Sequence, residues 1–285
     1  MNSVLFIVGM HRSGTSALSG MMRFCGYEHG RRLLDPAQDN PTGFWEPGPV
    51  MEVNDRVLAA MGASWHRVPA WLTWPDQTPA DAGAWMTDSF ADVAADAWDR
   101  AFGTGPAGNN PLTDDSLKDG SGGVSTRSHP KGDPQPEAEG RRLVCKDPRL
   151  CLTLPLWLQV ARAKGFAASV LCIHREPRAI MASLTRRNGL DFAAVAALIT
   201  DYWWHAIQTV PEETGTVRYE TLLQSPEDAL GAHGITFTSG EAAEQARAFL
   251  AKGRALAPPP PPGGARPRPP PPERRGQGRV GRGGG

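Results

Sequence analysis

The fold is decided by one stretch near the N-terminus, which reads Ser3-Val4-Leu5-Phe6-Ile7-Val8-Gly9-Met10-His11-Arg12-Ser13-Gly14-Thr15-Ser16. Its first six residues are an apolar run of strand length, and Thr15–Phe24 carries the spacing of a helix. A glycine-bounded loop between a strand and a helix can direct backbone N–H groups at an anion. The spacing matches the phosphate-binding pattern G-x-x-x-x-G-K-[ST], except that Thr15 stands at the lysine position.

The loop itself is therefore the first candidate site, for an anion such as a phosphate group. An arginine inside the loop supplies the cation that the missing lysine would have supplied, and it can donate charge-assisted hydrogen bonds. We expect the loop histidine to face solvent or a second substrate. The alternative for the whole loop is a simple glycine turn. The candidate binding residues are His11, Arg12, Ser13, Gly14, Thr15 and Ser16.

A second candidate anion site follows the strand expected at Ala168–Ile173. Arg175 leaves the carboxyl end of that strand, where open α/β sheets bind ligands. Ser183 falls in the second turn of the helix expected at Pro177–Arg187. The guanidinium and the hydroxyl could share one phosphate through hydrogen bonds. The alternative is a helix start with a surface arginine.

Strand-like and helical segments alternate along the rest of the chain. Helices are expected at Val50–Met61, Ala80–Ala101, Leu152–Lys164 and Phe192–Gln208, and strands at Arg142–Cys145 and Thr216–Tyr219. The segments Thr221–Ala229 and Glu241–Leu256 close the ordered body. This alternation predicts an α/β protein with a parallel sheet of the P-loop NTPase type and helices on both faces.

Two segments differ from this body in composition. Gly103–Gly140 is rich in Gly, Asp, Ser and Pro, and we interpret it as a disordered insert. Residues 257–285 hold ten prolines, eight glycines, six arginines and a single branched aliphatic residue, too few apolar groups to offset the entropy of ordering. One domain is therefore expected over residues 1–256. We interpret the disordered tail as out-of-frame translation of a GC-rich gene; a proline-rich docking tail or a basic RNA-binding arm is the alternative.

The overall charge is balanced. Thirty Lys and Arg face thirty Asp and Glu, which argues against a partner such as nucleic acid or a membrane surface held by bulk charge. No apolar run approaches the roughly 18 residues of a membrane helix. Four cysteines without a C-x-x-C pair indicate reduced thiols in a cytoplasmic protein. The histidines share no metal-ligand spacing, so we expect no metal.

Together these motifs resemble the P-loop sulfotransferases, which use 3′-phosphoadenylyl sulfate (PAPS) as co-substrate. The resemblance spans about residues 3–230. It implies that the loop binds the 5′-phosphosulfate and that Arg175 and Ser183 bind the 3′-phosphate. Asn40–Glu46 and Lys146–Leu150 resemble the bacterial branch associated with glycan synthesis. The implied reaction moves a sulfuryl group from PAPS to a hydroxyl of a glycan or small molecule.

Such a transfer needs a base near the acceptor hydroxyl and cations near the leaving oxygen. The resemblance implies Glu46 as the base, with Asp147, at the end of an expected strand, as its rival. Lys146 and Arg12 are the candidate catalytic cations. For Asp147 the alternative is a helix cap, and for Glu46 an ordinary surface position. Trp45 is the one tryptophan that we expect to stack on a sugar ring.

Two other functions stay open. A magnesium-dependent P-loop kinase would use Asp147 as an acidic residue at a strand end. A non-catalytic or decayed nucleotide-binding protein is suggested by the unusual tail.

Removing the tail tests the domain boundary. A chain truncated at Ala257 should melt at the same temperature as the full chain, because the tail has almost no apolar side chains that could pack on the domain. Scanning calorimetry of both proteins measures this. A melting temperature lower by several degrees in the truncated chain would show that the tail packs.

Overall fold

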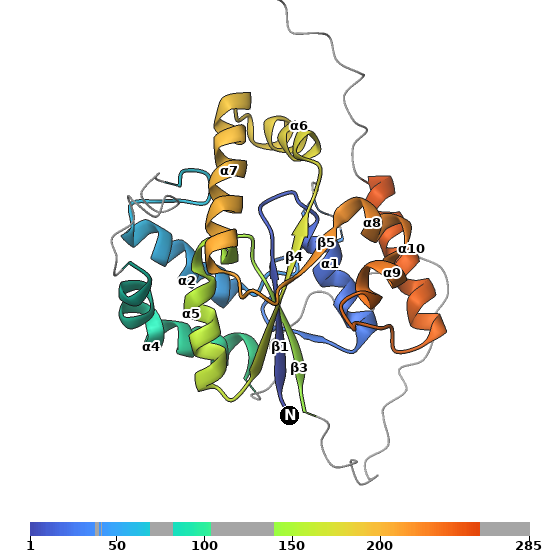
Figure 1. Ribbon diagram of the computed structural model, residues 1–285, viewed down its shortest axis with the longest axis horizontal. Coiled ribbons are helices and arrows are strands. Elements are labelled where there is room, and N and C mark those ends of the chain that lie inside the picture. The colour runs from blue at the N-terminus through green and yellow to red at the C-terminus, as the bar shows by residue number, and fades with distance from the viewer. Residues whose placement is uncertain (38–39, 41, 69–81, 104–139, 257–285) are drawn as a thin grey trace, which may run out of the picture.

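The computed structural model describes residues 1–37, 40, 42–68, 82–103 and 140–256, so nearly all of the expected insert and the whole tail lie outside the described residues. Within these, five parallel strands form one sheet (Figure 1). The strands are β1 (Ser3–Val8), β2 (Glu28–His29), β3 (Arg142–Lys146), β4 (Ala167–His174) and β5 (Gly215–Arg218).

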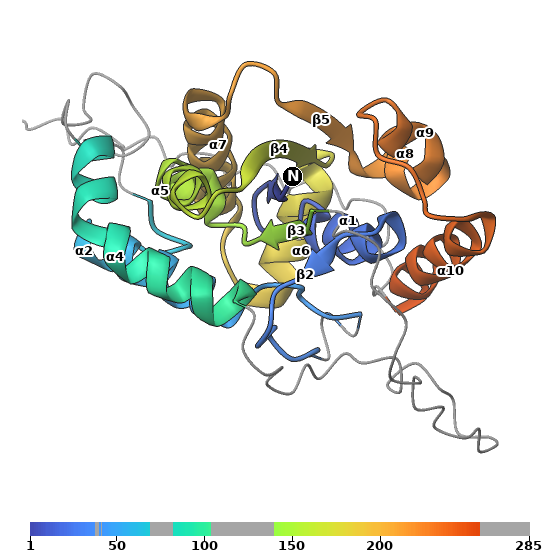
Figure 2. The ribbon, with the colours of Figure 1, turned by 90° about the horizontal axis from the view of Figure 1, so that it is seen from below.

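Helices connect these strands and cover both faces of the sheet, as the sequence predicts. They are α1 (Thr15–Met21), the 3-10 helix η1 (Met22–Cys25), α2 (Gly48–Ala60), α4 (Ala82–Phe102), α5 (Leu150–Ala163), α6 (Pro177–Asn188), α7 (Phe192–Thr209), α8 (Tyr219–Gln224), α9 (Pro226–Gly231) and α10 (Gly240–Leu256). In Figure 2, α2, α4, α5 and α7 lie on one side of the sheet, and α1 with α8, α9 and α10 lies on the other.

The strand order β2-β3-β1-β4-β5 places β1 at the centre of the sheet. Ile7 of β1 lies beside Lys146 of β3, and Val8 lies beside Cys172 of β4. Because parallel strands end at the same edge, the residues that follow β1, β3, β4 and β5 gather at one edge of the sheet. That edge is where open α/β sheets bind ligands.

Two apolar cores hold the layers together, and β1 contributes to both. Phe6, with Val4 and Val8, packs into the core formed mainly with α2, α4, α5 and α7, while Leu5 and Ile7 pack into the core that includes α1, α9 and α10. Alternate side chains of a strand point to opposite faces, so a strand covered on both faces must be apolar throughout. This requirement explains the apolar run at the start of the chain.

Two glycines of the phosphate loop meet different steric demands. A Cβ on Gly9 would lie 2.6 Å from the carbonyl oxygen of Ile173 in β4. Position 9, where the loop leaves the sheet, therefore has no room for a side chain. Gly14 has φ +100°, a conformation that glycine adopts at little cost, and a Cβ there would meet the ring of Tyr219. Both glycines are therefore needed for the path of the loop.

The differences from the expected elements have local causes. The helix after the loop changes to a 3-10 helix at Met22 and ends at Gly26, which has φ +78°. The segment expected at Thr221–Ala229 is two helices, because Pro226 holds the preceding Ser225 out of the helical region. β2 was not expected, since two residues are too short for a sequence pattern.

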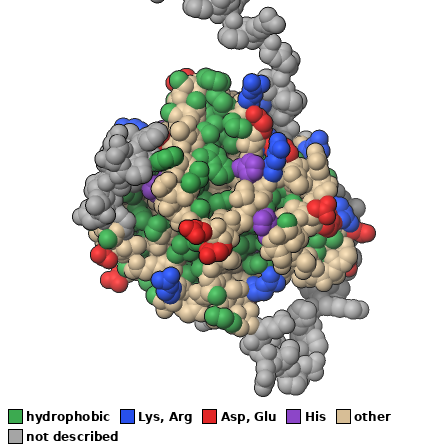
Figure 3. Space-filling model, in the orientation of Figure 1, with side chains coloured by type: hydrophobic (Ala, Val, Ile, Leu, Met, Phe, Trp, Pro, Cys, Tyr) green, Lys and Arg blue, Asp and Glu red, His purple; other side chains and the backbone are tan. Residues whose placement is uncertain are grey.

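The surface agrees with the balanced composition. On the face shown in Figure 3, acidic and basic side chains are interspersed rather than gathered by sign. Within the described residues, no helix combines the length and the apolar character needed to cross a bilayer.

Substituting Gly9 tests the close approach between the loop and β4. Gly9→Ala should destabilise the protein by about 1–3 kcal/mol, because the new methyl group meets a backbone carbonyl that cannot rotate away. Gly231→Ala is the matched control, since a Cβ there has open space around it. Urea denaturation of both variants measures the difference. Equal stabilities would contradict the steric role of Gly9.

Candidate active site

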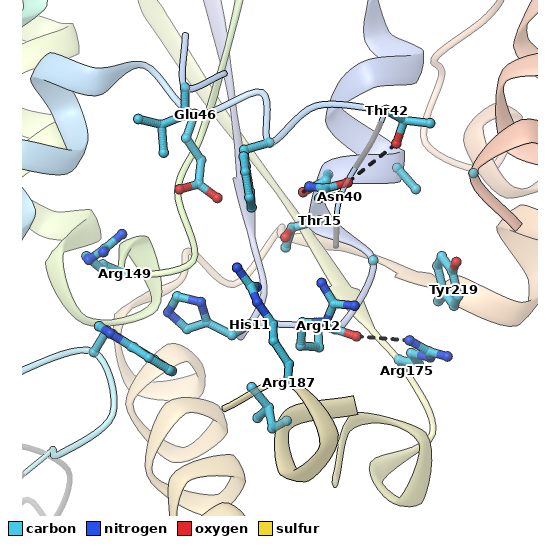
Figure 4. A pocket seen from close by; sticks show the side chains of 18 of the residues that line it. His11, Arg12, Thr15, Asn40, Thr42, Glu46, Arg149, Arg175, Arg187 and Tyr219 are labelled. Carbon is cyan, nitrogen blue, oxygen red and sulfur yellow. Dashed lines mark hydrogen bonds between the residues drawn. The ribbon is translucent and has the colours of Figure 1, made fainter. Parts of the chain in front are cut away.

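A cavity of about 390 Å³ opens at the carboxyl edge of the sheet (Figure 4). Its walls come from the loop after β1 and from residues that follow β3, β4 and β5. Seven of the expected site residues line it: His11, Arg12, Gly14, Thr15, Ser16, Glu46 and Arg175. The fold therefore brings together expected site residues that are up to about 160 positions apart in sequence, from His11 to Arg175.

The two expected anion sites are in contact, although of the second pair only Arg175 lines the cavity and Ser183 is absent from its wall. Nε of Arg12 donates a hydrogen bond of 2.7 Å to Oγ of Ser183, which is 5% exposed. A terminal nitrogen of Arg175 donates to the carbonyl oxygen of Arg12 at 3.3 Å, and its guanidinium lies 4.9 Å from the centre of the Tyr219 ring. The phosphate loop and the Arg175/Ser183 pair are thus parts of one site.

Ser13 has a different position from the other loop residues. Its side chain is completely buried, and both its hydroxyl and its backbone N–H donate to the carbonyl oxygen of Met10, at 2.8 and 3.2 Å. Ser13 therefore closes the turn of the loop. Thr15 and Ser16, in contrast, line the cavity itself.

A buried ion pair stands at the other end of the cavity. Glu46 is 6% exposed and lines the cavity, and its Oε1 accepts a hydrogen bond of 2.5 Å from Nζ of Lys146. Lys146 is 1% exposed, is absent from the cavity wall, and also donates to Ser16 Oγ and the carbonyl oxygen of Phe44 at 3.1 Å each. Burial raises the pKa of Glu46 above its ordinary value, and the ammonium of Lys146 opposes only part of that rise.

Asp147, the rival base, is turned away from the cavity. Its carboxylate is completely buried and accepts hydrogen bonds from the backbone N–H of Arg149 at 2.8 Å and from the Arg149 guanidinium at 3.1 and 3.2 Å. Arg149 also donates to Asp55 at 2.6 Å and lines the cavity. Asp147 therefore holds an arginine that lines the cavity. The alternative of a helix cap is not confirmed, because Arg149 is the N-cap residue of α5 and that helix has no side-chain cap hydrogen bond.

His11 does not face open solvent. Its ring lies 4.7 Å from the ring of Trp65 and 5.8 Å from that of Tyr202, and its Nε2 is buried with no partner among the described residues. Burial, together with the positive charges of Arg149 and other nearby cations, holds the pKa of His11 well below its usual value. The imidazole is therefore neutral and presents an unsatisfied nitrogen at the cavity wall.

The expectation for Trp45 is wrong. Its side chain is 4% exposed and packs against His29 and Phe249, with ring centres at 4.7 and 6.1 Å. The indole therefore belongs to the core and is not available to stack on a sugar ring. Among the tryptophans of the described residues, Trp65 lines the cavity.

Two arginines of the site were not among the candidates. Arg149 lies two residues after Asp147, in the run Lys146–Leu150, where only the lysine and the aspartate were candidates. Arg187 lies four residues after Ser183 in α6, and residues at that spacing share one helix face. In Figure 4, Glu46, Arg149 and His11 lie on one side of the cavity and Arg175 and Tyr219 on the other, with Arg12 and Arg187 between them.

The site was also compared with known proteins. No protein-family model and no curated protein matches this chain. Two similar solved structures are the sulfotransferase domain of the olefin synthase of Synechococcus PCC 7002 and the sulfotransferase domain from the curacin biosynthetic pathway. The first has a TM-score of 0.42 and 17% identity, over 89% of this chain and 88% of that one. The second has a TM-score of 0.42 and 15% identity, over 85% of this chain and 77% of that one.

Neither name refers to glycan synthesis, so the glycan-associated branch gains no support from these two structures.

Proposed function

We propose that this protein is a sulfotransferase that moves the sulfuryl group of PAPS to a hydroxyl of a glycan or small-molecule acceptor. The observation that carries the proposal is the hydrogen bond between Arg12 and Ser183. It joins the phosphate loop to the second motif, whose Arg175 lines the cavity while Ser183 is buried and absent from its wall. Glu46 presents a carboxylate at the far end of that cavity. The cavity therefore has residues that could bind a donor with phosphate groups at two positions, and a carboxylate that could act as the base for the acceptor.

The donor end is suited to an anion with several phosphate groups. Arginines form charge-assisted hydrogen bonds with phosphate and often bind it with two nitrogens at once. Arg175 would hold the 3′-phosphate, and Ser183 would reach it only after a local shift, because its hydroxyl is buried against Arg12. Arg12, Thr15 and Ser16 would hold the 5′-phosphosulfate. Bound there, PAPS supplies a sulfuryl group that can be transferred without a further cofactor.

The chemistry at the opposite end requires removal of a proton from the acceptor hydroxyl. Glu46 faces the cavity with only Oε1 hydrogen-bonded among the described residues, which leaves Oε2 for the acceptor. Its raised pKa makes it a stronger base than an exposed glutamate. Arg12, between the two ends, would stabilise charge on the leaving phosphate oxygen.

A magnesium-dependent kinase is less well supported by the same residues. In that reaction the hydroxyl at the position of Ser16 and an acidic residue after a neighbouring strand would hold the metal. Here Ser16 Oγ accepts a hydrogen bond from the ammonium of Lys146, and Asp147 is engaged by Arg149. A fixed positive charge on the hydroxyl opposes a divalent cation at that place.

Titration with nucleotides separates the alternatives. Metal-independent binding of adenosine 3′,5′-bisphosphate (PAP) by calorimetry, and release of PAP from PAPS in the presence of 4-nitrophenyl glycosides or simple alcohols, would support the sulfotransferase. Binding of ATP that requires magnesium would support the kinase. Binding of neither nucleotide would indicate a non-catalytic protein.

Arg175→Ala tests the assignment of the 3′-phosphate. PAP affinity should fall roughly ten- to a hundred-fold, since a hydrogen bond to a charged group contributes about 1.5–3 kcal/mol. Adenosine 5′-phosphosulfate lacks the 3′-phosphate and should lose much less. Isothermal calorimetry with both ligands measures the two changes. Equal losses would show that Arg175 contacts another part of the donor.

Glu46→Gln tests the base. The amide keeps the shape but cannot accept the proton, so kcat should fall roughly 10²- to 10⁴-fold while PAP affinity holds. In the wild type, kcat/KM should decline as the pH falls through the raised pKa of Glu46, because the protonated carboxyl is no base, and this decline should vanish in the variant.

Asp147→Asn is the control for that experiment. Because Asp147 is turned away from the cavity, this variant should keep the acid limb of the pH profile. The overall rate can still fall, since Arg149 loses the negative charge with which it pairs. An acid limb that disappears in Asp147→Asn but persists in Glu46→Gln would move the base to Asp147.

A further inference from the structure

Lys146 is enclosed by the three oxygens to which it donates. Its Nζ lies 3.1 Å from Ser16 Oγ, 3.1 Å from the carbonyl oxygen of Phe44 and 2.5 Å from Oε1 of Glu46. A lysine ammonium has three protons to donate, so these partners take all of them. The side chain is 1% exposed and does not reach the cavity.

This position has a direct consequence for what Lys146 can do. A buried ammonium behind the cavity wall has no path to a substrate oxygen unless its present hydrogen bonds break. Two of its partners, however, belong to the two working ends of the site. Ser16 lies in the phosphate loop, and Glu46 is the residue to which the base role is assigned.

We propose that Lys146 is a positioning residue, which keeps the carboxylate of Glu46 ionised and fastens it to the phosphate loop, and that it does not contact the leaving group. This inference rests on the proposed function, because it assigns a role toward the base of that reaction. It replaces the sequence-based expectation that Lys146 stabilises charge on the donor.

The charges around Glu46 explain why an ammonium is needed there. Burial and the nearby carboxylate of Asp147 both raise the pKa of Glu46, while Lys146 and, more weakly, Arg149 lower it. Without Lys146, the buried carboxyl would take up a proton at a higher pH and would cease to act as a base over more of the neutral range. The hydrogen bond to Ser16 fixes where the pair stands relative to the donor loop.

Lys146→Met removes the charge and keeps most of the side-chain volume. The acid limb of kcat/KM, followed as PAP release from PAPS with the best acceptor of the panel above, should move up by about 1–3 pH units. PAP affinity should stay within about three-fold, since Lys146 does not line the cavity. Lys164→Met is the matched control, because Lys164 pairs with Asp99 at the surface, and it should leave the profile unchanged. An unshifted limb in Lys146→Met would overturn the proposal.

A double variant separates positioning from direct contact with the donor. If Lys146 acts only through Glu46, then adding Lys146→Met to Glu46→Gln should cause no further loss of kcat. A further loss of ten-fold or more in the Glu46→Gln background would overturn the proposal and return Lys146 to the leaving group. Replacing both members of a buried ion pair is better tolerated than removing one. The comparison of the double variant with Glu46→Gln can therefore be made even if Lys146→Met alone does not fold.

Stability provides a readout that does not require turnover. In Lys146→Met the pKa of Glu46 is higher folded than unfolded, so the native state holds more protons and the free energy of unfolding should fall as the pH rises between the two pKa values. The fall should vanish in the double variant. The fall in Lys146→Met should be larger than in the wild type, and a profile in Lys146→Met that matches the wild type would overturn the pairing. If the wild type does not bind PAP, both the proposed function and the role of Lys146 are overturned. If the wild type turns over PAPS but the acid limb is unshifted in Lys146→Met, only the role of Lys146 is overturned.

Discussion

Because β1 lies between β3 and β4 and is covered by helices on both faces, the chain can leave this strand only at the carboxyl edge of the sheet. At that point the backbone passes so close to Ile173 that only glycine fits. The loop that follows must therefore lie beside the ends of β3 and β4. The contacts of Arg12 with Ser183 and of Lys146 with Ser16 are consequences of this one path.

Much of this arrangement could be predicted from the sequence. The apolar run before Gly9 indicated a strand buried on both faces, and the strand-helix alternation indicated a parallel sheet. From these two facts it follows that residues after different strands meet at one edge. Arg12, Arg175 and Glu46 were expected at a common site, and the structure places all three on the wall of one cavity.

The parts that could not be predicted depend on side-chain direction. The sequence places Lys146 and Asp147 at a strand end, but it does not say that one turns toward Glu46 and the other toward Arg149. Trp45 was expected to stack on a sugar ring, yet it fills the core next to Phe249. The directions of these side chains are determined by contacts with segments that are distant in sequence, so no local sequence pattern indicates them.

The charges beneath the cavity form two linked groups. Lys146 pairs with Glu46, and Arg149 pairs with Asp147 and Asp55. Buried ion pairs add little to stability, because the cost of desolvating the charges offsets most of their attraction. The fold accepts this cost at the edge of the sheet where the proposed reaction would use a base and fixed cations, while β1 and its neighbours keep the rest of the core apolar.

The hydrogen bond between Arg12 and Ser183 joins residues 171 positions apart. A ribosome adds about 5–20 residues each second, so the loop emerges roughly ten to thirty seconds before its partner exists. For most of that interval, until β3 is made at Arg142–Lys146, the apolar strand β1 has neither sheet partner beside it. The order of synthesis thus makes the beginning of the chain the segment that depends longest on protection from aggregation.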